Sequence, residues 1–231
     1  MAQKTSFTPA EQFVKYALEI GALELVPEGR KLKSGRISPY FFNSGLFNTG
    51  SSIDHLAHAY ASALDAPFGK EVEVIFGPAY KGIPLSVAVA MKWATLSGFD
   101  VEYAFNRKEA KDHGEGGTIV GASLQGKMVL IADDVMTTGT SSGEAVETIK
   151  VNGGIPIGGV IAFDRQELGK SGCYSAVQEF QKNYEIPVCA AATLTDLISV
   201  LEKTPAESGD DNVGEMLDKI LAYKKEYGVF S

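Results

Sequence analysis

The feature that most constrains the fold of this chain is an apolar run that ends in two aspartates and a loop of hydroxyl residues. Residues 128–132 (MVLIA) are continuously apolar, which is typical of a parallel strand covered on both faces. Asp133 and Asp134 follow at its carboxyl end, and a loop over residues 137–142 (TTGTSS) leads into a predicted helix over residues 143–151. A strand, a polar loop with a glycine and a helix in this order predict an α/β fold with an anion site.

The loop over residues 137–142 has the groups that bind a phosphate. Its backbone N–H groups can converge on an anion, the helix N-terminus adds a positive dipole end, and Gly139 lets the backbone turn closely. Carboxylates repel phosphate, so Asp133 and Asp134 are expected to accept hydrogen bonds from sugar hydroxyls or from water on a magnesium ion. The sequence therefore predicts that a phosphate, a sugar and a metal ion meet at this loop.

Two acidic residues after an apolar strand, followed by TTGT, resemble the motif that binds phosphoribosyl pyrophosphate (PRPP) in type I phosphoribosyltransferases. The usual middle of that loop is Ala-Gly, and Thr138-Gly139 keeps the glycine here. The alternative is an ordinary βα turn before a capped helix, which the whole string disfavours. The resemblance implies that PRPP contacts the residues of this motif, which are Asp133, Asp134, Val135, Met136, Thr137, Thr138, Gly139, Thr140 and Ser141.

Strands and helices alternate along most of the chain. Strands are predicted at residues 72–76, 101–105, 128–132, 155–163 and 186–193, and helices at residues 84–96, 143–151, 175–184, 194–203 and 213–227. This alternation predicts a doubly wound parallel sheet whose site lies at the carboxyl ends of its strands. The resemblance implies the type I phosphoribosyltransferase fold, which has a central five-stranded parallel sheet flanked by helices and a small hood subdomain.

The length and the pattern predict a single domain over residues 1–231. Its expected parts are a hood mainly over residues 1–66, a core over about residues 70–203 and a C-terminal helix over about residues 212–228. The elements expected in the hood are a helix that begins at a Thr8–Glu11 capping box, a hairpin around Ser34-Gly35 and a helix over residues 52–64.

The charge and the cysteine content narrow the choice of partners. A net charge of −8 disfavours nonspecific binding to nucleic acid or to an anionic membrane, so an anionic substrate needs a local basic patch. Cys173 and Cys189 are far apart in the sequence, which excludes a structural zinc site and makes a disulfide framework implausible. The first residues contain no apolar signal region, so the cytoplasm is the expected compartment.

Cationic residues follow the first two predicted strands. Lys81 lies at the tip of the tight loop in FGPAYKGIPL, and FNRKEAKDHGEGG holds Arg107, Lys108, Lys111 and His113. Each residue could be solvated and without a role, which is the usual reading of a bare charge run. Their position after strand ends in an acidic chain, and the glycines beside them, favour a mobile cationic lid that neutralises a departing anion and excludes water.

Both strings resemble those of the orotate phosphoribosyltransferases. The resemblance implies that Tyr80 and Lys81 contact PRPP and that the second string is the catalytic loop of this group. In the family that loop reaches into the site of the neighbouring subunit, which implies a homodimer with shared active sites. The catalytic residues implied are Lys81, Arg107, Lys108, Lys111, His113, Asp133 and Asp134.

Two further strings, LKSGRISPYFFN and FDRQE, resemble the parts of these enzymes that bind the base. The resemblance implies that Lys33 reaches orotate and PRPP and that Phe41-Phe42 lines the pyrimidine. It also implies that Arg165 grips the orotate carboxylate with its forked guanidinium group. Without the family, the aromatic residues would belong to the core, the cations to the surface, and Arg165 to a local pair with Asp164 or Glu167.

The resemblance implies the transfer of the 5-phosphoribosyl group of PRPP to orotate, which gives orotidine 5′-monophosphate and pyrophosphate in pyrimidine synthesis. Magnesium would be carried mainly by PRPP, and the sequence assigns no protein residue as its direct ligand. A transferase for another nucleobase would keep the motif around Asp133 and change the hood. A PRPP-sensing transcription regulator on the same fold would need a basic DNA-reading element, and this acidic chain disfavours it.

Overall fold

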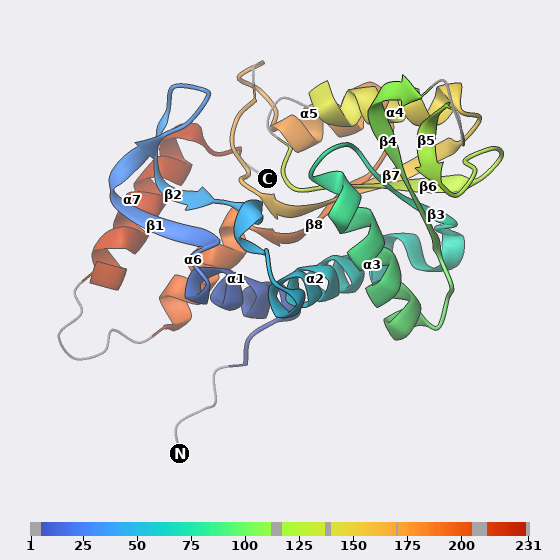
Figure 1. Cartoon of the computed structure of the whole chain (residues 1–231). Helices are drawn as coiled ribbons and strands as arrows, with labels where there is room; N and C mark the ends of the chain where they lie inside the picture. Colours follow the sequence, from blue (N-terminus) through green and yellow to red (C-terminus); the bar gives the residue numbers. More distant parts are fainter. Residues whose placement is uncertain (1–5, 112–116, 137–139, 170, 205–211, 230–231) are drawn as a thin grey trace.

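Six strands form the central sheet, in the order β5-β4-β3-β6-β7-β8 (Figure 1). Neighbouring strands are parallel except at β5, which runs antiparallel to β4 at one edge. The strands are β3 (Val74–Gly77), β4 (Glu102–Lys111), β5 (Gly117–Gly121), β6 (Met128–Asp133), β7 (Ile155–Asp164) and β8 (Val188–Thr193). The computed structural model describes residues 6–111, 117–136, 140–169, 171–204 and 212–229. The predicted α/β fold and its five parallel strands are confirmed.

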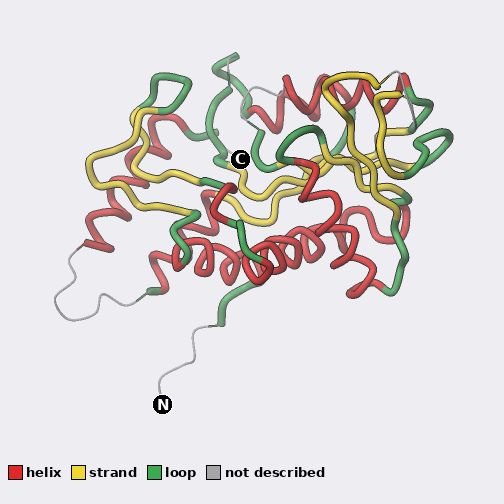
Figure 2. The backbone as a smooth tube through the Cα atoms, in the orientation of Figure 1, coloured by secondary structure: helices red, strands yellow, loops and turns green. Residues whose placement is uncertain are grey.

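Helices cover both faces of this sheet, as Figure 2 shows in red on either side of the yellow strands. The helices are α1 (Pro9–Glu19), α2 (Gly50–Phe68), α3 (Gly82–Ser97), α4 (Thr140–Val151), α5 (Ala176–Tyr184), α6 (Leu194–Lys203) and α7 (Asn212–Tyr227), with short 3-10 turns at Ser44–Leu46 and Gly69–Glu71. Successive residues of β6 enter different cores: Leu130 belongs to the cluster that includes α2 and α3, and Ile131 to the cluster that includes α4 and α5. The continuous apolar run therefore reflects burial on both faces.

The hood contains a separate two-stranded antiparallel sheet, formed by β1 (Leu23–Lys31) and β2 (Ile37–Phe42). The hairpin predicted around Ser34-Gly35 is present, and α7 packs against both of its strands. Helix α2, which lies inside the range expected for the hood, packs on α3, β7 and β8 of the central layer instead. The division of the chain into a hood and a core stays a prediction.

The main departure from the expected pattern is at the edge of the sheet. Strand β4 was expected to end at residue 105, with a loop after it, but it continues to Lys111, which pairs with Gly117 of β5. The loop prediction was therefore wrong for residues 106–111 and missed β5. An edge hairpin can consist of polar residues because one of its sides faces water, so its sequence lacks the apolar run that marks a buried strand.

Glu11 connects α1 to α6 through hydrogen bonds. Thr8 and Glu11 form the predicted capping box, and the carboxylate is buried with only 3% of the residue exposed. Its Oε1 accepts hydrogen bonds from Ser199 Oγ (2.6 Å) and Lys203 Nζ (2.5 Å) on α6. The bonds from Lys203 and Ser199, with the Thr8 amide, lower the pKa of Glu11 from 4.5 to about 2.

Replacing Glu11 with glutamine is expected to lower the thermal midpoint at neutral pH by a few degrees. The folded carboxylate has the lower pKa, so its stabilisation is fully present above pH 4.5 and is lost as the pH falls toward about 2. The difference in unfolding free energy between the wild type and Glu11→Gln should therefore shrink with acidification, which urea unfolding at a series of pH values measures. A difference that stays constant would show that the ionised carboxylate contributes nothing.

Candidate active site

Functional side chains gather where the parallel strands end. Asp133 is the last residue of β6, Arg165 follows β7, and Lys81 follows β3 directly before α3. Because β3, β6 and β7 are neighbours in the sheet, their carboxyl ends lie side by side. This is the edge at which open α/β sheets hold their ligands.

Among the described residues, no helix is long and apolar enough to cross a membrane.

Lys81 and Asp134 form an ion pair at this edge. Lys81 Nζ lies 2.6 Å from Asp134 Oδ2, and the side chains are 63% and 12% exposed, respectively. Ser44, in the segment between β2 and α2, donates from Oγ to the same Asp134 oxygen at 2.7 Å and accepts from Lys81 Nζ at 3.3 Å. The ammonium group is thus held over the strand ends while most of its side chain stays open to a ligand.

The two aspartates are fixed by local hydrogen bonds. Both residues are buried, the Asp134 amide donates to Asp133 Oδ1 at 2.9 Å, and the Val135 amide donates to Asp134 Oδ1 at 2.9 Å. The Tyr60 hydroxyl of α2 donates to the Asp133 carbonyl oxygen at 2.7 Å. These bonds orient the carboxylates before any ligand arrives, so little ordering remains to be done on binding.

The loop that carries Lys81 is held by a close backbone approach. A Cβ atom built on Gly77 would lie 1.9 Å from the carbonyl oxygen of Gly82, so β3 and α3 can meet in this way only with glycine at position 77. The Ala79 amide donates to Asn106 Oδ1 of β4 at 2.8 Å. Beside Lys81 is a cavity of about 510 Å³, lined mainly by apolar residues such as Phe47 and Leu85.

The cations predicted to form a lid begin on the edge hairpin. Arg107 and Lys108 lie on β4, and Lys108 Nζ is 5.1 Å from the centre of the exposed Tyr80 ring. The structure thus brings Lys108 and Tyr80 together. Lys111 ends β4, and Thr140 and Ser141 begin α4, but their side chains are outside the description. His113 and the loop residues Thr137, Thr138 and Gly139 lie outside the described residues, so their predicted contacts stay predictions.

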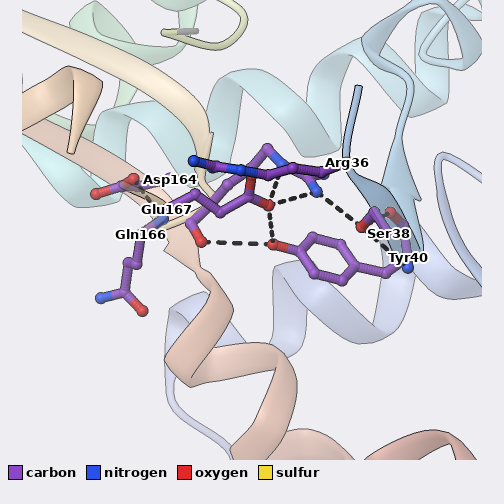
Figure 3. A network of polar contacts seen from close by, with 7 residues as sticks. Arg36, Ser38, Tyr40, Asp164, Gln166 and Glu167 are labelled. Carbon is purple, nitrogen blue, oxygen red and sulfur yellow. Dashed lines mark hydrogen bonds and ion pairs between the residues drawn. The ribbon is translucent and has the colours of Figure 1, made fainter. Parts of the chain in front are cut away.

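Arg165 follows β7 and bonds to Ser38 and Glu167, which Figure 3 shows in a polar cluster with Arg36 and Tyr40. Its Nε and Nη2 lie 2.8 and 2.6 Å from Glu167 Oε1, and Nη2 donates to Ser38 Oγ at 2.8 Å. The guanidinium carbon lies 4.2 Å from the centre of the Tyr40 ring, and the Tyr40 hydroxyl donates to Glu167 Oε1 at 3.1 Å. The local pair with Glu167 therefore forms, whereas the predicted role toward orotate is not tested.

The residues of the hood that were predicted to bind the base differ in how exposed their side chains are. Lys33 is exposed in the hairpin turn, and Phe41 is half-buried beneath Arg30, whose guanidinium carbon is 3.9 Å from the ring centre. Phe42 is buried and stacks on Phe163 with ring centres 5.6 Å apart. The Phe42 side chain is therefore core, as the reading without the family expected, and a role in lining a base would rest on its backbone.

Several residues of the site carried no sequence signal. Ser44, Ser38 and Tyr40 belong to the hood sequence but join the site only because the hairpin and the β2–α2 segment fold over the strand ends. Asn106 was taken as the start of a loop. The burial pattern of β2 does not single them out either, because Ser38, Pro39, Tyr40 and Phe42 are all buried.

The described residues contain no group of three or more His, Cys, Asp or Glu side chains that could hold a metal ion. Asp133 and Asp134 offer two hard oxygen ligands at the end of β6. Such a pair suits a magnesium ion, which keeps several waters and takes its other ligands from substrate phosphates.

Comparisons with known proteins agree with this geometry. The chain matches the model of the phosphoribosyl transferase domain over residues 44–188. It is 50% identical over 218 residues to an orotate phosphoribosyltransferase from Nitrosococcus oceani, with 94% of each chain covered. The crystal structure of a Francisella tularensis orotate phosphoribosyltransferase superimposes with a TM-score of 0.80 at 38% identity, covering 94% of this chain and 99% of that one. The Mycobacterium tuberculosis enzyme in complex with PRPP shares the fold, at a TM-score of 0.60 and 19% identity, covering 82% of this chain and 99% of that one.

Proposed function

We infer that this chain, which belongs to the phosphoribosyl transferase domain family, is an orotate phosphoribosyltransferase. It transfers the 5-phosphoribosyl group of PRPP to orotate and releases orotidine 5′-monophosphate and pyrophosphate. The observation that carries the inference is the identity of 50% over nearly the whole chain, together with the Lys81–Asp134 pair at the strand ends. We also propose that the protein acts in the cytoplasm, which is the compartment expected from the sequence.

We propose that different residues of the site bind different parts of PRPP. The loop over residues 137–141 would hold the 5′-phosphate, and Asp133 and Asp134 would accept hydrogen bonds from the ribose hydroxyls. Lys81, with Arg107 and the other cations of the edge hairpin, would hold the diphosphate. The support for this arrangement is that β4, β3 and β6 are neighbours in the sheet, with Arg107 on β4, Lys81 after β3 and Asp133 at the end of β6.

Catalysis would then be electrostatic. As the bond to pyrophosphate lengthens, positive charge develops on the ribose carbon and negative charge on the leaving group, which Lys81 and the lid cations stabilise. A magnesium ion, when bound through PRPP, adds positive charge at the same place. We propose that orotate attacks in the form whose ring nitrogen is deprotonated, which would require no dedicated general base from the chain.

The function is tested by following the loss of orotate absorbance with PRPP and magnesium. The proposal predicts turnover that needs both substrates and that adenine or hypoxanthine cannot support in place of orotate. Activity with a purine and none with orotate would assign the chain to another branch of the family, and specific DNA binding in a gel shift would favour a regulator.

The proposed homodimer with shared sites has its own test. Lys111→Ala and Asp134→Ala are each expected to inactivate the enzyme, because one removes a lid cation and the other a ribose ligand. If the lid of one subunit serves the site of the other, each mixed dimer has one intact site. Random mixing of the two variants then restores up to about a quarter of the wild-type activity in the whole sample. Each variant re-mixed with itself is the control, and no recovery on mixing would show that each subunit is complete.

A further inference from the structure

The cluster after β7 contains a carboxylate that the proposed reaction does not use. Glu167 Oε1 lies within 3.1 Å of three donors, which are Arg165 Nε, Arg165 Nη2 and the Tyr40 hydroxyl, and Oε2 lies 3.4 Å from Arg36 Nη1. The Glu167 side chain is only 11% exposed. A buried carboxylate with this many partners holds its neighbours in place, because moving any one of them leaves a buried charge unpaired.

These contacts determine which edge of Arg165 is available. Glu167 occupies the edge formed by Nε and Nη2, and Ser38 Oγ takes a further bond from Nη2. Among the described residues, the hydrogen bonds and ion pair of the guanidinium group use Nε and Nη2, and the buried Tyr223 hydroxyl, which has no hydrogen-bond partner, lies close enough to Arg165 for the guanidinium charge to affect the pKa of that hydroxyl. The Tyr40 ring beneath the guanidinium plane prevents it from tilting. One face and one edge of the group are therefore fixed, and Nη1 remains for a ligand.

The loop that carries Glu167 is itself clamped by the C-terminal segment. The Leu168 amide donates to the Tyr227 carbonyl oxygen at 2.8 Å, and the Val229 amide donates to the Gln166 carbonyl oxygen at 2.9 Å. Gln166 has a left-handed backbone with φ of 51°, and its side chain points away from the cluster (Figure 3). Because α7 packs on the hairpin that supplies Ser38 and Tyr40, it braces both sides of Arg165.

We propose that Glu167 is a positioning residue for recognition of the base, which holds Arg165 so that Nη1 faces the carboxylate of orotate. The proposal rests on the proposed function, because only a base with a carboxylate gives Nη1 of Arg165 an anionic partner. Glu167 does not touch the substrate. It determines where the guanidinium group lies, and the C-terminal helix contributes by fixing the loop.

Two conservative variants separate position from charge. Glu167→Gln keeps the reach of the side chain and an acceptor for Arg165 but loses the charge, whereas Glu167→Asp keeps the charge and draws it back by one methylene. If position matters, Glu167→Asp raises the KM for orotate about tenfold or more, and Glu167→Gln raises it by less than about threefold. In both variants the KM for PRPP stays near that of the wild type, and the melting temperature falls by no more than it does in Glu11→Gln.

The matched control is Glu11→Gln, which removes a buried, lysine-paired carboxylate on α1 and should leave both KM values unchanged. An orotate KM raised as much by Glu167→Gln as by Glu167→Asp would show that charge alone matters, and an unchanged orotate KM in both would show that Arg165 needs no support. A parallel rise in the KM for PRPP would indicate a general distortion; each of these results overturns the proposal. A wild-type enzyme that consumes no orotate would instead overturn the proposed function.

Discussion

Replacing Lys81 with alanine is expected to lower kcat by about 10²–10³-fold, the loss seen when one preorganised electrostatic group is removed from a transition state. The ammonium group is held 2.6 Å from Asp134 at the strand ends, where the diphosphate is proposed to leave. Negative charge grows on that diphosphate as the glycosidic bond breaks, so the effect should fall on turnover more than on the KM for PRPP.

Lys92→Ala provides the matched control for this prediction. Lys92 lies on α3, the helix that begins directly after Lys81, but it pairs with Asp54 on α2 rather than with a residue at the strand ends. Its removal should leave kcat within about twofold of the wild type. A Lys81→Ala enzyme with full turnover and only weaker PRPP binding would assign Lys81 to ground-state binding alone.

Replacing Arg165 with lysine is expected to lower kcat/KM for orotate by about 10²-fold or more, as expected when a buried charge pair loses its geometry. Lysine keeps the positive charge, but it cannot donate to Glu167, Ser38 and a substrate carboxylate from one planar group. Tyr40 and Glu167 outweigh the effect of burial and raise the pKa of Arg165, so the wild-type side chain is charged at any working pH.

The KM for PRPP shows whether the effect of Arg165→Lys is confined to orotate. Arg165 follows β7 and bonds to Glu167 and Ser38 rather than to the Lys81–Asp134 pair that the diphosphate is proposed to meet, so the KM for PRPP should be unchanged in Arg165→Lys. Arg30→Lys, which alters an exposed arginine stacked on Phe41, serves as the control substitution in the hood. An Arg165→Lys enzyme with normal orotate kinetics would show that the base is recognised elsewhere.

The sequence contained enough information to predict the parallel sheet, because residues 128–132 and 155–163 are apolar without interruption and burial on both faces requires such runs. It also located Lys81, Asp133, Asp134 and Arg165, since each lies at the carboxyl end of a strand or in the segment that follows one. Positions relative to strand ends are local information, and the rules of α/β topology convert them into proximity.

Contacts between the hood and the core were beyond this reasoning. Ser44 bonds to Asp134 across 90 residues of sequence and Ser38 to Arg165 across 127, and no local pattern specifies such pairs. The same is true of β5, whose three β-branched residues, Thr118, Ile119 and Val120, are too short a run to indicate a strand without the edge that β4 offers. The reading of Phe42 as a core residue was right, because its side chain is buried and stacks on Phe163.

The central claim is that PRPP binds at the end of β6 with its diphosphate beside Lys81, and a crystal structure of the enzyme soaked with PRPP and magnesium tests it most directly. The account predicts the 5′-phosphate on residues 137–141, the ribose hydroxyls on Asp133 and Asp134, and Lys81 turned from Asp134 to the diphosphate. A bound PRPP that lies elsewhere, with the Lys81–Asp134 pair intact, would contradict it.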